Sequence, residues 1–210
     1  MGATYTLTTI LSGVRDLLNE DTADFWTDAQ LTRLANDAER DVAIRSGCIK
    51  VIDTLTCAVD TRLVAFTGYK VGYLEYITDG LGLMKTFPSQ LGRIPTDGTA
   101  PEKWFESGSN VGIEPMPDEK YTLSAYIHDY PSAEMTGANA PKVPAYAHFL
   151  IILKTLALAL EKEKRYGQAL QINSIYENGL EFLTNDIEEF MPESWEQAAS
   201  DRSSGRSIGI

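Results

Sequence analysis

Histidine and cysteine are the residue types in this chain best suited to metal binding or nucleophilic chemistry, and there are two of each. Cys48 and Cys57 are too far apart for a CxxC site and have no histidine nearby, so we expect two ordinary reduced thiols. His128 falls on the outer side of an expected strand and His148 in an expected helix. Because neither has an HExxH partner or a neighbouring cysteine, we expect polar or semi-buried roles and no metal site.

Other catalytic signatures are also missing from the sequence. Its GxSxG spacing, "GRSIG" at 205–209, lies in the Ser- and Gly-rich end of the sequence and not between an expected strand and helix, so it is not a nucleophile elbow. The glycines of "DGLGLM" fit neither a P-loop nor a dinucleotide-binding fingerprint. The acidic runs "EKEK" and "DIEE" lie in expected helices, where such residues form solvated faces or i,i+4 pairs. We therefore expect no catalytic residues, no cofactor and no enzymatic activity.

Composition indicates an acidic globular protein. The chain has 210 residues, a net charge of −12 and 43% hydrophobic residues, which is enough to build a core. Its basic residues are scattered, which argues against a grip on nucleic acid. The charge has two readings: a solvated surface that favours solubility, or a surface that DNA passes without sticking. No apolar run approaches the roughly 18 residues of a membrane span, and no signal peptide is expected.

Two amphipathic helices are expected near the N-terminus. The first covers "TLTTILSGVRDLLN", and the second "WTDAQLTRLANDAERDVAIRSG". Thr27 and Gln30 have the spacing of a capping box, and Gly47 suits the left-handed position after the helix. The first helix is expected to bury Leu7, Ile10, Leu11, Val14, Leu17 and Leu18. The second is expected to point Arg33, Asp37, Arg40 and Asp41 to water.

Two further helices are expected after residue 143. Pro144 suits the first position of a helix running through "AYAHFLIILKTLALALEKEKR", which is apolar on nearly all sides and should sit centrally. Tyr166 and Gly167 are expected to break the chain before a fourth helix. Its apolar stripe is expected to contain Ile172, Ile175, Tyr176, Gly179, Leu183, Ile187 and Phe190. From Met191 the sequence is rich in Ser and Gly, which is typical of an extended tail.

Between the two helical regions the sequence changes to short strand-like segments. They are rich in β-branched and aromatic residues and are bounded by Gly, Pro, Asp and Asn. In "YTLSAYIH", Tyr121, Leu123, Ala125 and Ile127 are expected to share one face. The sequence thus predicts an α+β fold, a bundle of about four helices with an inserted antiparallel β region. The expected divisions are N-terminal helices at 1–49, a β subdomain at 50–133, C-terminal helices at 134–190 and a tail at 191–210.

Three of these segments, in this order, resemble the head–tail adaptor (connector) proteins of tailed bacteriophages, including the tail tubular protein A type. They are "WTDAQLTRLANDAERDVAIRSG", "VGIEPMPDEKYTLSAYIHDYP" and "VPAYAHFLIILKTLALALEKEKRYGQA". Together they span most of positions 6 to 190. Residues 63–90 depart from the family pattern, because the usual Leu-Pro strand opening is not evident there.

The resemblance implies a structural virion protein, made in the bacterial host cytoplasm and located in the neck between capsid and tail. It implies a ring of twelve subunits beneath the portal protein, presenting a platform to a tail or nozzle component. DNA would pass through the lumen without specific binding, and no membrane is involved. In the resembled family the C-terminal tail is thought to insert into the portal. That gives hypothetical portal contacts at Trp195, Arg202, Arg206, Ile208 and Ile210, against the alternative of an unstructured end.

Two alternatives stay open from the sequence. One is another neck or tail-completion protein, with a different partner and ring size. The other is a small non-enzymatic helical module that binds a ligand or regulates, with the Tyr-rich strands lining a pocket. A regulator would ignore portal rings, whereas an adaptor would bind them even if it is monomeric when free.

Overall fold

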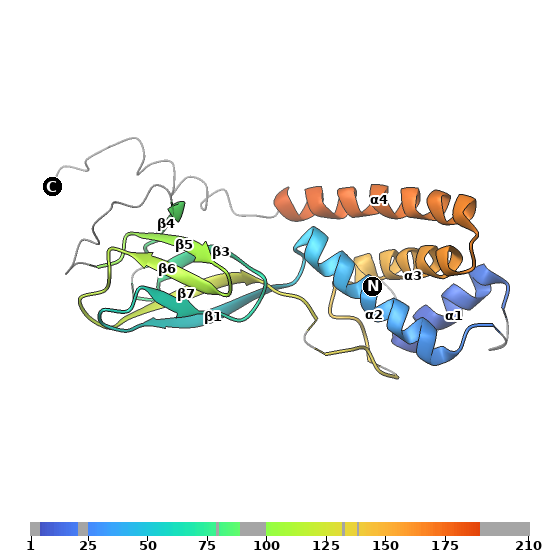
Figure 1. The fold of residues 1–210 in the computed structure, drawn as a ribbon, viewed down its shortest axis with the longest axis horizontal. Coiled ribbons are helices and arrows are strands. Elements are labelled where there is room, and N and C mark those ends of the chain that lie inside the picture. Colours follow the sequence, from blue (N-terminus) through green and yellow to red (C-terminus); the bar gives the residue numbers. More distant parts are fainter. Residues whose placement is uncertain are drawn as a thin grey trace. The chain divides into compact units, whose positions relative to one another are not determined.

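The computed structural model describes residues 5–20, 25–78, 80–88, 100–131, 133–137 and 139–189, with side chains as far as residue 185. The chain forms two compact units. The first, here called the helical unit, is built from residues 1–49 and 130–190, and the second, the β unit, from residues 50–129. The four helices and the antiparallel sheets in Figure 1 confirm the predicted α+β fold.

Helix α1 (Leu7–Leu18) begins with a reciprocal cap. The Thr6 side chain accepts a hydrogen bond from the Thr9 backbone N–H, and the Thr9 side chain accepts one from the Thr6 N–H. One face of α1 is buried, but Leu17, expected on that face, is 52% exposed. Its position one step beyond the stripe places it on the outer side of the helix.

Helix α2 (Asp28–Ser46) confirms the predicted capping box of Thr27 and Gln30 and the left-handed Gly47. The prediction that Asp41 points to water is wrong. Its Oδ2 accepts a hydrogen bond of 2.6 Å from the Tyr176 hydroxyl, and burial together with this bond raises the pKa of Tyr176. A distant helix therefore binds a residue that the local pattern marks as a solvated charge.

Helix α3 (His148–Lys162) is the centre of the helical unit, as its apolar sequence predicts. It packs against α1, α2 and α4, and most of its residues are buried. Pro144 does not start the α-helix itself. It precedes a single 3₁₀ turn (Ala145–Ala147), and its carbonyl accepts the Ala147 N–H at 2.8 Å.

Helix α4 (Tyr166–Glu189) follows α3 after a tight turn. The predicted break at Tyr166 and Gly167 is wrong, because the chain reverses at Lys164, which has a φ of 64°, and both residues lie inside α4. Tyr176 and Leu183 face the core as predicted, whereas Ile175 is 52% exposed. The buried row of α4 faces α3, and Ile175 lies on its flank.

The first sheet of the β unit has the strand order β1-β7-β3. It consists of β1 (Lys50–Cys57), β7 (Tyr121–His128) and β3 (Lys70–Tyr76), and both pairings are antiparallel. Leu123, Ala125 and Ile127 are buried on one face of β7, as their alternation predicts.

The second sheet has the order β2-β6-β5-β4. It consists of β2 (Leu63–Ala65), β6 (Asn110–Glu114), β5 (Lys103–Ser107) and β4 (Met84–Lys85). Strand β4 lies in a segment expected to be a loop and pairs with β5 in parallel, an exception to the antiparallel pattern. Residues of both sheets share one core: Leu55, Cys57, Val71, Leu74, Leu83, Trp104, Val111, Ile113, Leu123, Ala125 and Ile127.

Candidate interaction surfaces

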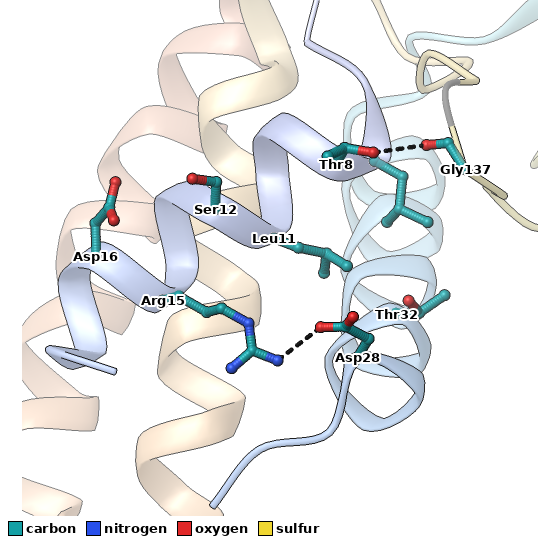
Figure 2. A pocket seen from close by; sticks show the side chains of 9 residues that line it. Thr8, Leu11, Ser12, Arg15, Asp16, Asp28, Thr32 and Gly137 are labelled. Carbon is teal, nitrogen blue, oxygen red and sulfur yellow. Dashed lines mark hydrogen bonds and ion pairs between the residues drawn. The ribbon is translucent and has the colours of Figure 1, made fainter. Parts of the chain in front are cut away.

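A groove of about 490 Å³ opens along helices α1 and α2 within the helical unit. It is lined by Leu7, Thr8, Leu11, Ser12, Arg15, Asp16, Asp28, Thr32 and Gly137. Figure 2 shows the Leu11 and Arg15 side chains of α1 pointing toward Asp28 and Thr32 of α2. The wall is mainly small and polar, with leucines at its base.

Arg15 holds the two walls of this groove in place. Its Nη2 donates to the Trp26 carbonyl at 2.8 Å and to Asp28 Oδ1 at 2.7 Å, and its Nη1 contacts Glu20 Oε2 at 3.3 Å. Glu20 Oε1 in turn accepts the backbone N–H groups of Phe25 and Trp26, at 2.6 and 2.8 Å. Because these hydrogen bonds connect Arg15 of α1 to the residues at the start of α2, Arg15 has a structural role in shaping the groove.

The chain segment that leads into α3 is held against α2 by buried polar side chains. Asn36 Oδ1 accepts the Met135 N–H at 2.6 Å, and Glu39 accepts the N–H of Lys142. Glu39 is 1% exposed, and its burial raises the pKa of its carboxyl group. Sequence reasoning missed this clamp, because Glu39 sits between charged residues in "DAERD" and nothing local marks it as buried.

His148 belongs to the same packed region. Its Nδ1 accepts the Tyr5 N–H at 3.3 Å, so its Nε2, 3.0 Å from the Val143 carbonyl, carries the proton of a neutral ring. Burial lowers the pKa of His148, which favours that neutral form. His148 is 2% exposed, so its structural role is more deeply buried than the polar or semi-buried role expected from the sequence.

The other candidate metal-binding or nucleophilic residues also have structural roles. His128, in β7, lies near the Tyr69 ring with centroids 6.2 Å apart. Burial raises the pKa of the Cys57 thiol to about 11, so it stays protonated and unreactive. Within the part of the chain that the structure describes, no three His, Cys, Asp or Glu residues are grouped so that they could hold a metal ion.

The β unit has an open groove of its own, of about 630 Å³, beside strand β4. Its lining is largely apolar: Tyr76, Leu81, Gly82, Met84, Ala100, Pro101 and Glu102. The Tyr76 hydroxyl donates to the Pro101 carbonyl at 2.5 Å and fixes one wall. Three of its lining residues, Leu81, Gly82 and Met84, lie in or just before β4.

The portal contacts hypothesised from the sequence cannot be placed on either unit. Trp195, Arg202, Arg206, Ile208 and Ile210 all lie outside the described residues. The two grooves are formed by residues that the sequence analysis did not single out as a site. Leu11 and Thr32, for example, become neighbours only when α1 and α2 pack.

These features define an α+β protein of two units, each with its own core and an open groove. The profile of the SU10 adaptor protein family matches residues 5–202, and the chain belongs to this family of phage head–tail adaptor proteins. A search of curated proteins found no matching relative. None of the described helices is long and apolar enough to span a bilayer. Family membership makes the protein a structural component of a phage virion.

Proposed function

We propose that copies of this chain form a ring of twelve beneath the portal and join the DNA-filled capsid to the tail. The observation that carries the proposal is the family match over residues 5–202, which implies oligomerisation and contact with portal and tail. The compact helical unit provides a body that can pack side by side. The β unit, with an apolar groove of its own, provides a surface that can meet the next tail component.

Such a ring needs two lateral surfaces that differ, because contacts that close by rotation are heterologous. In this proposal the helices at 1–49 and 134–190 form the wall of the ring, and the strand region 50–133 presents the platform. The neck location, the portal joint and the passage of DNA during genome ejection all follow from this arrangement.

The net charge of −12 supports a channel that does not bind DNA. Acidic side chains repeated around a lumen would repel phosphates and allow the genome to slide. A reconstruction of the ring with a lumen lined by Lys and Arg would contradict this part of the proposal.

The segment after residue 190 supplies the portal joint in this proposal. Trp195, Ile208 and Ile210 are isolated apolar residues, with Arg202 and Arg206 among them, and such a segment can order on binding. Removing residues 192–210 should abolish attachment to portal while leaving the two folded units intact. Unchanged attachment of the truncated protein would remove these five residues from the joint.

The proposal is tested by mixing the purified protein with its portal and imaging the product by cryo-electron microscopy. A twelve-membered collar of this chain on the tail-facing side of the portal is the expected result. A protein that stays monomeric or dimeric and ignores the portal would support the regulatory alternative. A collar of other size or attached to another component would indicate a different neck protein.

A further inference from the structure

The outward side of helix α4 is poor in charge. Among its exposed residues Glu181 is the charged one, and Glu177, with a side chain that is 41% exposed, is paired with Arg45 of α2. Leu170 is 71% and Phe182 75% exposed. The exposed residues are Tyr166, Gly167, Gln168, Leu170, Gln171, Ser174, Ile175, Asn178, Glu181, Phe182 and Asn185. We call this surface the α4 face. Small and amide side chains run along its middle, and apolar residues line both borders.

Helix α2 shows what an ordinary solvated helix of this protein looks like. Its exposed charged residues are Asp28, Arg33, Asp37, Arg40 and Arg45. Depletion of charge together with exposed aromatic and aliphatic residues is the signature of the core of a protein interface. The α4 face has this signature, and α2 does not.

Helix α1 presents a second surface of the same kind, here called the α1 face. Its exposed residues are Thr8, Thr9, Ser12, Asp16 and Leu17, and the groove of about 490 Å³ runs beside it. Asp16 is the one charge on this face. An apolar side chain from another molecule would meet half-buried Leu11 at the groove.

The two faces lie on opposite sides of the helical unit. Helix α3 packs against both α1 and α4, and Figure 1 shows it between them. A protein with unlike charge-poor surfaces on opposite sides has the geometry needed for contacts that repeat from copy to copy. A protein that used one of these surfaces to bind a different protein would not need a second charge-poor surface on the opposite side.

The charges at the ends of the two faces are complementary. Lys164 is exposed just before α4, and Asp16 is exposed near the end of α1; neither has an ion-pair partner among the described residues. From Tyr166 to Ile175 is nine steps of helix, as is Asp16 back to Leu7, about 14 Å in each case at 1.5 Å per residue. If Lys164 lies beside Asp16, α4 therefore runs antiparallel to α1. The apolar border residues Tyr166, Leu170 and Ile175 then lie along the whole of α1.

We propose that the α4 face of one copy packs against the α1 face of the next copy, and that this contact is the lateral interface of the assembly. The inference rests on the ring of the proposed function and names the surfaces that close it. Helix α1 of the neighbour lies between the two apolar borders of α4. In this register the small residue Ser174 lies beside Thr8 of the neighbour and allows a close approach.

Paired cysteines test the contact directly in the full-length protein assembled with its portal. The double variant Thr8→Cys with Ser174→Cys, treated with a short bis-maleimide, should give a ladder of covalent multimers that ends at the size of the ring. Each single variant should give no ladder above the background of Cys48 and Cys57. The matched control pairs Asp37→Cys, on the charged side of α2, with Ser174→Cys and should also give none.

A second measurement uses charge instead of cross-linking. Leu170→Glu and Ile175→Glu, both at exposed positions, should fold normally by circular dichroism and lower the yield of rings at least tenfold. Ile52→Glu, at a 65% exposed apolar residue of the β unit, is the matched control and should leave the yield unchanged.

The outcomes separate this inference from the proposed function. Rings that form normally with Leu170→Glu and do not cross-link through Thr8 and Ser174 would overturn the interface and leave the adaptor role standing. Glutamate variants whose rings form but no longer bind the portal or tail would assign the α4 face to that partner. This result would also overturn the proposed interface. A strong dimer from Ser174→Cys alone would indicate a two-fold contact instead. A wild-type protein that forms no ring would overturn both proposals.

Discussion

The helical unit and the β unit are held together by different means. In the helical unit a central apolar helix is covered by three others, and buried polar side chains such as Glu39 and His148 fix the connecting segments. In the β unit, short strands from two sheets close on one apolar core around Trp104. In the helical unit, the free energy of unfolding should therefore depend most on single polar contacts. In the β unit, it should depend most on the volume of the core side chains.

The largest effect is expected from Trp104→Ala in the β unit. Trp104 is 1% exposed, and truncation of a buried tryptophan costs about 3–5 kcal/mol of unfolding free energy. Hydrogen exchange should show faster exchange in β5, β6 and β7 and unchanged protection in α3. Phe87→Ala, at an exposed residue, is the control and should change stability by no more than about 0.5 kcal/mol. Equal loss of protection in α3 would mean that the two units unfold together, and the contrast between them would fail.

The next effect is expected from Glu39→Ala in the helical unit. Removing the carboxylate leaves the part-buried N–H group of Lys142 and the N–H group of Val143 without their acceptor, which should cost about 1–3 kcal/mol in total. Glu39→Gln keeps one acceptor oxygen and should cost much less. The measurement is chemical denaturation of both variants, with hydrogen exchange at residues 139–143. Equal stability of the two variants would show that the clamp does not depend on hydrogen bonding.

Acid should affect the helical unit through His148. Its pKa is lowered from the ordinary value of 6.5 by burial, so the unfolded chain takes up a proton at a higher pH than the folded one. The stability that the neutral ring contributes is present above pH 6.5 and is lost as the pH falls through the folded-state pKa. Denaturation of the wild type and of His148→Gln at about pH 7.5 and about pH 5.5 should show a larger loss in the wild type. An equal loss would place the pH sensitivity elsewhere.

The smallest effect is expected from Glu177→Gln, which breaks the bidentate pair between α4 and Arg45 of α2. The atoms are 2.5 and 2.8 Å apart, and Arg45 lowers the pKa of Glu177, but both side chains are 41% exposed. Pairs of this exposure contribute no more than about 1 kcal/mol. Glu181→Gln on the same helix is the control for loss of charge alone. A change well above that size would mean that polar contacts on the surface rival the buried clamps.

The sequence determined those parts of the molecule that depend on near neighbours in the chain. The Thr27–Gln30 cap and the end of α2 at Gly47 arise within one turn of helix, so local residue types are sufficient to predict them. The central position of α3 follows from its apolar composition. The alternation in β7 predicted its buried face. The order of three such segments was also enough to point to the adaptor family.

The tertiary structure alone decided which side chains meet across long stretches of chain. Glu39 is buried because residues 142 and 143 return to α2, and Asp41 is bonded because Tyr176 reaches it from α4. The parallel pairing of β4 and the exposure of Ile175 depend in the same way on distant partners. No local pattern records such pairings, since the free energy of burying a group is set by what surrounds it. The charge-poor faces of α1 and α4 therefore became visible only when the helices were placed around α3.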